Sequence, residues 1–285
     1  TMAKARRRRG AALRVMIRLR GGSAQTTPTQ HVDDDRCGAA EEQNSPDDRD
    51  PEVEGLTSGG EEFEHDHDDT AYPRHMVELL WDSPDPYTAT LVLGHGAGAA
   101  MDSAGMNDAA RVIASRGIRV ARFEFAYMAG RREGVRKPPP RADTLLGEYR
   151  DVVAQAAVDG PVFIGGRSMG GRVASMVADE LHEAGTVLGL VCLGYPFHPP
   201  GKPEQLRTAH LEHLRTPALI VQGTRDEFGT REEVSGYALS PSIELVWLED
   251  GDHGLRPRKA VSGFTYAQHL ESMADAVAGF VGRVS

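Results

Sequence analysis

The chain has 285 residues, of which 40% are hydrophobic, and its formal net charge is −10 at pH 7. This length and composition suit one large α/β domain or two smaller domains with a sizeable core. The acidic balance argues against nucleic acid as the main partner, because a nucleic-acid-binding protein is expected to present a basic surface. Cys37 and Cys192 lie far apart in unlike sequence, which favours no disulfide and a reducing, cytoplasmic location.

Residues 1–72 differ in composition from the rest of the chain. They hold 16 acidic and 10 basic residues, and no acid occurs before residue 33. Low hydrophobicity and high charge predict a disordered extension, basic and then acidic, with the folded domain at 73–285. The run "AALRVMIRL" contains Arg14 and Arg18, so it is a poor signal-peptide core and too short to span a membrane. An organellar transit peptide, a plain unstructured extension and an over-long gene start all fit the acid-free opening.

From Tyr72 onward, predicted strands alternate with predicted helices. Strands are predicted over 75–81, 87–94, 118–125, 161–166, 187–194, 217–223 and 243–249, and helices over 106–117, 142–158, 170–185, 230–239 and 265–284. Residues 126–141 are predicted to form a loop, and the proline-rich stretch 195–216 leaves room for at most one short helix. This order predicts a single doubly wound, mostly parallel sheet with helices on both faces.

Side chains that can do chemistry follow four of the predicted strands. They are His95 after 87–94, Ser168 after 161–166, Asp226 after 217–223 and His253 after 243–249. In an open α/β sheet, ligands bind beyond the carboxyl ends of the strands, so these side chains are expected at one edge. The chain order Ser, Asp, His is that of the catalytic triad in α/β-hydrolases.

The three residues suit nucleophilic catalysis. Ser168 in "GGRSMGG" is the candidate nucleophile, His253 its general base, and Asp226 the carboxylate that orients the imidazole. Gly166 and Gly170 would permit the tight strand-to-helix turn that such a nucleophile needs. Each residue alone has a simpler explanation, as a helix-capping serine, a turn aspartate or a surface histidine. Their joint position after successive strands in the right order favours a triad.

Further residues are predicted around this triad. The backbone N–H groups of Met169 and Ala97 are expected to form an oxyanion hole, and His95 to shape the loop that carries Ala97. Cationic and aromatic candidates for substrate binding are Tyr127, Arg131, Arg132 and Arg167. The alternative is a solvated loop whose arginines pair with carboxylates such as Glu124, and for Arg167 both interpretations stay open.

Several stretches of this chain are recognisable together. They are "LGHGAGAAMDS", "FEFAYMAGRREGVRKPPPR", "GGRSMGG", "LGYPFHPPGKPEQLRT", "VQGTRDEFG" and "DHGL". The chain resembles the α/β-hydrolase superfamily, and within it the small predicted bacterial hydrolases related to testis-expressed protein 30 and to the hydrolase-like domain of subunit 3 of the nonspecific lethal histone acetyltransferase complex. The resemblance implies the α/β-hydrolase fold with Ser168, Asp226 and His253 at the triad positions. Residues 1–72 have no counterpart in it.

These observations predict a serine hydrolase that cleaves a carboxylic ester, thioester or amide through an acyl-enzyme intermediate. The expected partner is a small-molecule acyl substrate, with no nucleic acid and no membrane involved, and the short 195–216 stretch predicts a minimal cap over an open site. No metal or organic cofactor is predicted, and His65 to Asp69 are interpreted as a solvated charge run. An acyltransferase would use the same triad, and the alternative from another class is a non-catalytic scaffold or interaction module. The sequence assigns no oligomeric state.

Overall fold

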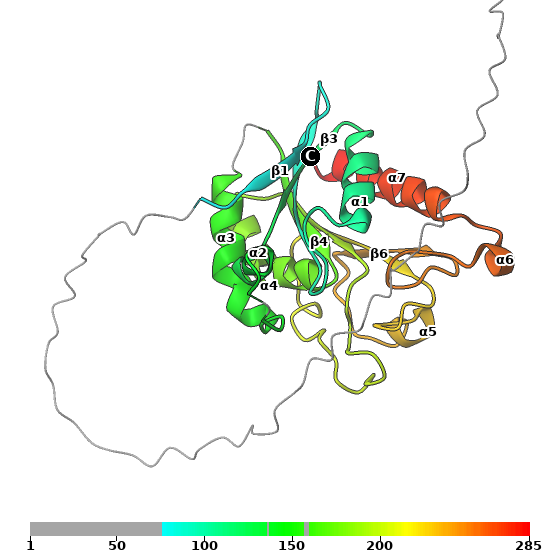
Figure 1. The fold of residues 1–285 in the computed structure, drawn as a ribbon. Helices are drawn as coiled ribbons and strands as arrows, with labels where there is room; N and C mark the ends of the chain where they lie inside the picture. The colour runs from blue at the N-terminus through cyan, green and yellow to red at the C-terminus, as the bar shows by residue number, and fades with distance from the viewer. Residues whose placement is uncertain (1–75, 136, 157–159) are drawn as a thin grey trace, which may run out of the picture. The chain divides into compact units, whose positions relative to one another are not determined.

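The computed structural model describes residues 76–135, 137–156 and 160–285, so the predicted extension 1–72 and the acidic histidine cluster 65–69 lie outside the described residues. Seven strands form one sheet in the order β1-β3-β2-β4-β5-β6-β7 (Figure 1). The strands are β1 (Leu79–Asp82), β2 (Ala89–Gly94), β3 (Ile118–Phe123), β4 (Val162–Arg167), β5 (Gly189–Leu193), β6 (Ala218–Gly223) and β7 (Ile243–Leu248). The predicted α/β fold class is therefore confirmed.

The sheet is parallel apart from its first edge strand. β1 pairs antiparallel with β3, and all other neighbouring strands pair in parallel. β2, β5 and β6 are buried along their whole length. A strand that is covered on both faces gains from an apolar side chain at almost every position, which explains the continuous apolar runs in the sequence.

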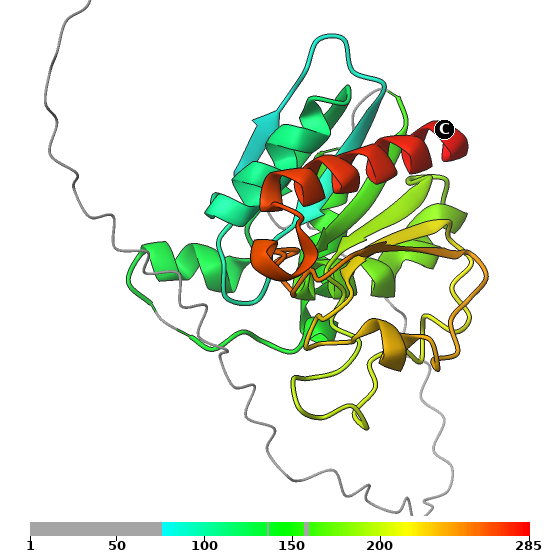
Figure 2. The same cartoon turned by 90° about the vertical axis from the view of Figure 1, so that its right-hand side faces the viewer.

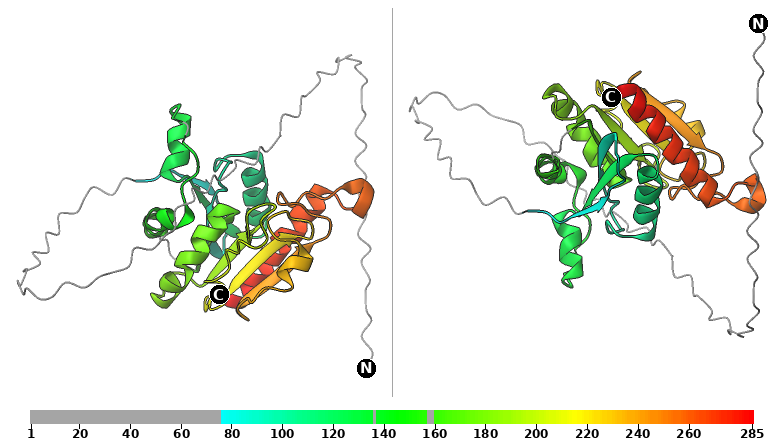
Figure 3. Two further views of the ribbon diagram at one scale, coloured as in Figure 1. Left: turned by 90° about the horizontal axis from the view of Figure 1, so that it is seen from below. Right: turned by 90° about the horizontal axis from the view of Figure 1, so that it is seen from above.

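Helices cover both faces of the sheet. One face carries the 3-10 turn η1 (Ala142–Leu145), α3 (Leu146–Gln155) and α4 (Met169–Glu183), and the other carries α1 (Ala104–Ala114) and α7 (Tyr266–Val284). α1 and α7 lie side by side in Figure 2, and Figure 3 shows the sheet between α4 and α7. Adjacent residues of β4 show the division, because Ile164 packs into the core beneath α3 and α4 while Phe163 packs into the core beneath α1 and α7.

Three short segments differ from the sequence prediction. The predicted loop 126–141 begins with the helix α2 (Ala126–Arg132), and α6 (Lys259–Ser262) was not predicted. The helix predicted over 230–239 is only α5 (Arg231–Val234), since the following N–H groups bond three residues back and turn the chain. Residues 195–216 contain turns and no helix, in keeping with the predicted minimal cap. Among the described residues, no helix has the length and hydropathy that crossing a membrane requires.

The parallel strands deliver the predicted side chains to one edge of the sheet. The loops after β2, β4, β6 and β7 begin at the carboxyl ends of these strands and carry His95, Ser168, Asp226 and His253. The sheet thus supplies the rigid frame from which the site is built.

Candidate active site

Ser168 occupies a strained turn between β4 and α4. Its φ of 50° and ψ of −119° fall where L residues are rare, at a cost of about 1–3 kcal/mol. The flanking glycines make this turn possible. A Cβ built on Gly166 would lie 2.3 Å from the Gly170 carbonyl carbon, and one on Gly170 would lie 2.5 Å from the Gly94 oxygen. The turn holds the serine side chain at the N-terminal end of α4, as the sequence predicts.

The three predicted triad side chains form a continuous chain of hydrogen bonds. Ser168 Oγ lies 2.8 Å from His253 Nε2, and His253 Nδ1 lies 2.9 Å from Asp226 Oδ2 and 3.1 Å from Asp226 Oδ1. With Asp226 ionised, Nδ1–H donates to the carboxylate, which leaves Nε2 free to accept the serine proton. This geometry is what a general base needs to take up a proton from Ser168.

Asp226 is held in place by the protein around it. Its side chain is fully buried, and it accepts hydrogen bonds from Gln222 Nε2 and from the Phe228 N–H, each at 2.9 Å. A buried carboxylate is stabilised only when such donors replace water. The centre of the Phe228 ring also lies 4.1 Å from the centre of the His253 ring, so the imidazole packs against an aromatic ring as well as bonding a carboxylate.

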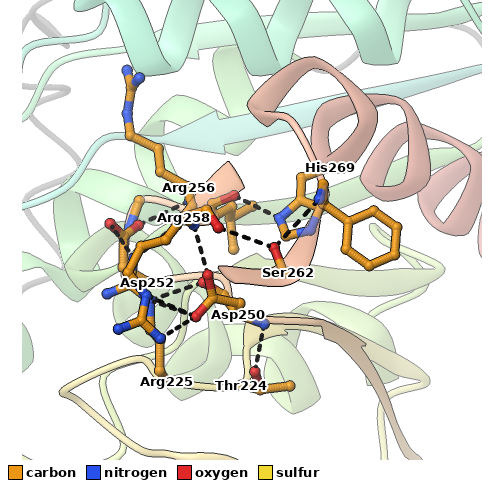
Figure 4. A network of polar contacts seen from close by, with 11 residues as sticks. Thr224, Arg225, Asp250, Asp252, Arg256, Arg258, Ser262 and His269 are labelled. Carbon is orange, nitrogen blue, oxygen red and sulfur yellow. Dashed lines mark hydrogen bonds and ion pairs between the residues drawn. The ribbon is translucent and has the colours of Figure 1, made fainter. Parts of the chain in front are cut away.

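A polar network fixes the loop that carries His253 (Figure 4). Asp252 Oδ1 accepts from the N–H groups of Gly254 and Arg256, and Asp250 Oδ2 accepts from the Arg258 N–H. Hydrogen bonds from the Arg258 guanidinium hold the pKa of Asp250 below its usual value. Both aspartates therefore bond the loop backbone and are not part of the Asp226 and His253 pair.

The two N–H groups predicted to form an oxyanion hole lie beside Ser168. Met169 is the first residue of α4, so its N–H has no acceptor within the helix. In the part of the chain that the structure describes, the Ala97 N–H likewise donates to no other protein atom. Ala97 follows Gly96, which lies so close to the turn that an added Cβ would sit 3.6 Å from the Ser168 Cβ. These donors are thus available to a bound group.

His95 supports the loop that carries Ala97. It is fully buried, its Nδ1 lies 2.7 Å from the Gly96 oxygen, and its Nε2 accepts from the Phe125 N–H at 3.2 Å. Burial lowers its pKa, which favours the neutral ring. With both nitrogens bonded to backbone, His95 is a structural residue of this loop.

Residues that follow β3 also hold the loop that carries Ala97. The Tyr127 hydroxyl donates to the Ala97 carbonyl oxygen at 3.1 Å, and Glu124 Oε1 accepts from the Met101 N–H at 3.1 Å. Arg132 then bonds both oxygens of Glu124, at 2.8 and 2.7 Å, and lies 2.8 Å from Asp102. Burial alone would raise the pKa of Glu124, but the hydrogen bonds from Arg132 and Met101 outweigh it and lower the pKa. We call Glu124, Tyr127 and Arg132 the loop brace.

The four residues predicted to bind substrate therefore have different surroundings. Tyr127 and Arg132 belong to the loop brace, and for Arg132 the structure shows the pairing with Glu124 that was the alternative. Arg131 donates to the Lys137 carbonyl oxygen at 2.9 Å, and its guanidinium lies 5.6 Å from the Tyr127 ring centre. Arg167 makes no hydrogen bond or ion pair with the side chains that the structure describes.

A second cluster of serine, histidine and tyrosine was missed by the sequence analysis. Ser175 Oγ lies 2.8 Å from His210 Nε2 and 3.2 Å from the Tyr195 hydroxyl. Ser175 is only 3% exposed and also donates to the Arg172 carbonyl oxygen. Burial lowers the pKa of His210 to about 4, which makes it a weak base. No pattern in the sequence pairs these residues, because the contact depends on how 195–214 folds against α4.

The site contains no cluster of metal-binding side chains. Across the described residues, no group of three or more histidine, cysteine, aspartate or glutamate side chains could hold a metal ion. Cys192 is fully buried in β5, and burial raises the pKa of its thiol. The reactive groups gathered at the sheet edge are therefore a hydroxyl, an imidazole, a carboxylate and two backbone N–H groups.

Comparison with known proteins identifies the family. Residues 87–282 match the model of the alpha/beta hydrolase domain, so the chain belongs to this family. Solved structures with this fold include dienelactone hydrolase from Anabaena variabilis (19% identity, 73% of this chain and 92% of that chain covered, TM-score 0.56). Est1E from Butyrivibrio proteoclasticus with bound ferulic acid (17%, 73% and 95%, 0.53) and a monoacylglycerol lipase from Paleococcus ferrophilus (12%, 74% and 100%, 0.53) are also similar. At these identities the likeness concerns the fold, which the chain shares with esterases and lipases.

Proposed function

We propose that the protein is a serine hydrolase that cleaves a carboxylic ester, thioester or amide through an acyl-enzyme intermediate. The observation that carries this proposal is the unbroken hydrogen-bond chain from Ser168 Oγ through His253 to the buried Asp226. The strained backbone of Ser168 supports it, because strain of this kind persists where function requires it.

The proposed reaction has two halves. Ser168 Oγ attacks the substrate carbonyl carbon while its proton passes to His253 Nε2, and the N–H groups of Met169 and Ala97 bind the developing oxyanion. The bond to the leaving group then breaks, and His253 returns the proton to the departing oxygen, sulfur or nitrogen. In the second half, His253 takes a proton from water, which attacks the acyl carbon, and the bond to Ser168 Oγ breaks as His253 returns the proton to that oxygen and the acid is released. The chain's own residues and water supply every group in this sequence.

The oxyanion donors are expected to contribute strongly to the rate. Removing one such donor in a serine hydrolase typically costs about 2.7–4 kcal/mol of transition-state stabilisation. Both donors here are backbone groups, so their positions depend on the α4 turn and on the loop that His95 and the loop brace support. This dependence gives the loop brace a role in catalysis without substrate contact.

The absence of a helical cap supports small or extended acyl substrates. Residues 195–216, between β5 and β6, form turns with no helix, so this segment supplies no large lid. A shielded tunnel for long-chain lipids is therefore disfavoured. An acyltransferase would differ from a hydrolase only in the group that accepts the acyl chain.

The alternative is a non-catalytic scaffold or interaction module of the same fold. The motifs around Ser168 and "DHGL" also support a closer relationship to the testis-expressed protein 30 group, and this resemblance is the source of the scaffold alternative. A hydrogen-bonded triad beside two backbone N–H groups that have no acceptor among the described residues favours catalysis over this alternative. The single buried cysteine among the described residues is in keeping with a cytoplasmic enzyme.

Hydrolysis of 4-nitrophenyl butyrate tests the proposal. We expect Ser168→Ala to lower kcat by about a thousandfold or more, because the nucleophile is lost. Ser175→Ala is the matched control, since Ser175 also bonds a histidine but has no carboxylate relay and is buried. It should retain activity. Equal activity of native protein and Ser168→Ala, or loss of activity only in Ser175→Ala, would contradict the proposal.

A further inference from the structure

Four arginines lie at the loop after β7, and the two aspartates of this loop pair with only two of them. Arg225 lies 3.4 Å from both Asp250 and Asp252, and Arg258 is paired with Asp250. These contacts engage both aspartates of the loop with two arginines. Two further arginines have no ion pair to any described carboxylate. Arg256 belongs to this loop, and Arg167, the last residue of β4, contacts it.

The Arg167 guanidinium lies between the start of α1 and the residue after His253. A Cβ built on Gly105 would lie 2.7 Å from Arg167 Nη1, and one built on Gly254 would lie 3.4 Å from Arg167 Nη2. α1 offers no neutralising charge there, because its first turn contains no acidic side chain. A guanidinium is always charged at neutral pH and has five donors, so this position leaves a strong unused capacity for an anion.

The Arg256 side chain also passes close to Gly254. The same added Cβ on Gly254 would lie 3.7 Å from Arg256 Cγ. The Arg256 guanidinium lies 4.2 Å from the Tyr266 ring centre and pairs with no carboxylate of the described residues. Figure 4 shows it extending away from the network around Asp250 and Asp252. A cation held over an aromatic ring keeps its outward N–H groups for another partner.

The nearest carboxylate already has several partners. Asp252 Oδ1 would lie 3.1 Å from a Cβ built on Gly254. This oxygen already accepts hydrogen bonds from the N–H groups of Gly254 and Arg256. Its other oxygen faces Arg225. The space beside Gly254 is thus bordered by the Arg167 guanidinium, by the aliphatic part of the Arg256 side chain and by a carboxylate whose acceptor positions are largely used.

We propose that Arg167 and Arg256 form an anion-binding site next to His253, and that the natural substrate carries a carboxylate or phosphate group there. This inference deepens the proposed function and rests on it. Arg167 precedes the nucleophile and Gly254 follows the base, so an anion bound between them belongs to a molecule engaged at Ser168. The guanidinium groups would fix the orientation of the substrate through charge-assisted hydrogen bonds.

Two pairs of esters test the site and show which half of the substrate carries the charge. The acyl pair is mono-4-nitrophenyl glutarate and its neutral methyl ester, and the leaving-group pair is 3-carboxyphenyl butyrate and its neutral methyl ester. For one pair we expect native protein to favour the anionic member in kcat/KM. Arg167→Gln and Arg256→Gln should each reduce that preference by about tenfold, the effect of one charge-assisted hydrogen bond, and leave the neutral member within about twofold.

Charge-conserving and distant variants separate recognition from general effects. Arg167→Lys should keep part of the preference, and Arg111→Gln, which removes an exposed charge elsewhere on α1, should keep all of it. The preference should also fall as salt is raised. No preference in either pair, or a preference that survives both Arg167→Gln and Arg256→Gln, overturns the inference while hydrolysis of the neutral esters still supports the proposed function.

A binding measurement covers the case in which no ester is cleaved. Calorimetric titration measures anion binding directly. The ligands are 3-hydroxybenzoate, its neutral counterpart 3-hydroxybenzamide, glutarate and inorganic phosphate. Binding of at least one anion that is lost in Arg167→Gln supports the site even if hydrolysis fails. Equal binding of 3-hydroxybenzoate and 3-hydroxybenzamide, with no binding of glutarate or phosphate, overturns it.

Discussion

Two histidines near Ser168 differ in the partners of their ring nitrogens. His95 bonds backbone atoms with both nitrogens and is fully buried, so its ring can only hold the loop in place. His253 bonds a carboxylate with one nitrogen and a hydroxyl with the other, and its side chain is 22% exposed. Histidine thus has a structural role after β2 and a candidate proton-transfer role after β7.

Tyr127 offers a test of the loop brace at the scale of one hydroxyl group. Tyr127→Phe removes the hydrogen bond to the Ala97 carbonyl oxygen, so the Ala97 N–H is held less firmly. We expect kcat for 4-nitrophenyl butyrate to fall by about two- to tenfold with little change in KM, since a hydrogen bond contributes about 0.5–1.5 kcal/mol. Affinity for a boronic acid that mimics the tetrahedral intermediate should fall by a similar factor.

A second tyrosine provides the control for this substitution. The Tyr237 hydroxyl is buried and has no hydrogen-bond partner within the described residues. Tyr237→Phe should therefore leave both kinetic constants unchanged. A rise in KM at constant kcat in Tyr127→Phe would instead indicate that Tyr127 contacts substrate, as first predicted, and would contradict the positioning role.

At the scale of elements, α2 shows why some structure could not be predicted. Its seven residues include Gly130, its N-cap Phe125 makes no side-chain capping bond, and the following sequence is rich in arginine and proline. These local features predict a loop. The helix is supported instead by the loop brace, which contacts Ala97 and Met101 in a loop far away in the chain. By contrast, the start of α5 has a local signal, because Thr230 and Glu233 form a capping box.

The segment 195–214 is joined to α4 through Ser175, Tyr195 and His210, and this contact makes stability depend on pH. The pKa of His210 is lowered by burial to about 4 in the folded state, against an ordinary value of 6.5. Between these values the unfolded chain binds more protons, so the free energy of unfolding must fall as pH falls through this window. We expect His210→Gln, which keeps an acceptor and cannot be protonated there, to weaken this dependence.

Urea unfolding of native protein and His210→Gln at several pH values between 4 and 7 measures this effect. His213→Gln is a suitable control, because His213 is exposed and lies three residues further along the chain. It should show the same pH dependence as native protein. An unchanged dependence in His210→Gln would contradict the assigned contact.

For the whole molecule, the parallel sheet explains why the triad positions can be predicted from the sequence and why the residues that support them cannot. Ser168, Asp226 and His253 are predictable because parallel strands place their carboxyl ends at one edge, and strand ends can be recognised locally. Gln222, Phe228 and the loop brace are not predictable in the same way. They act through contacts between separate elements, and no local periodicity or spacing indicates which side chains will meet.

The most direct measurement is covalent labelling with a fluorophosphonate, followed by mass spectrometry of the labelled peptide. A serine attacks phosphorus rapidly only when folding has joined it to its base and oxyanion donors. We expect folded native protein to take up one equivalent at Ser168, and Ser168→Ala and urea-unfolded protein to take up none. Labelling that is absent from the folded protein, or that occurs at another serine, would contradict the claim that Ser168, His253 and Asp226 act as one catalytic unit.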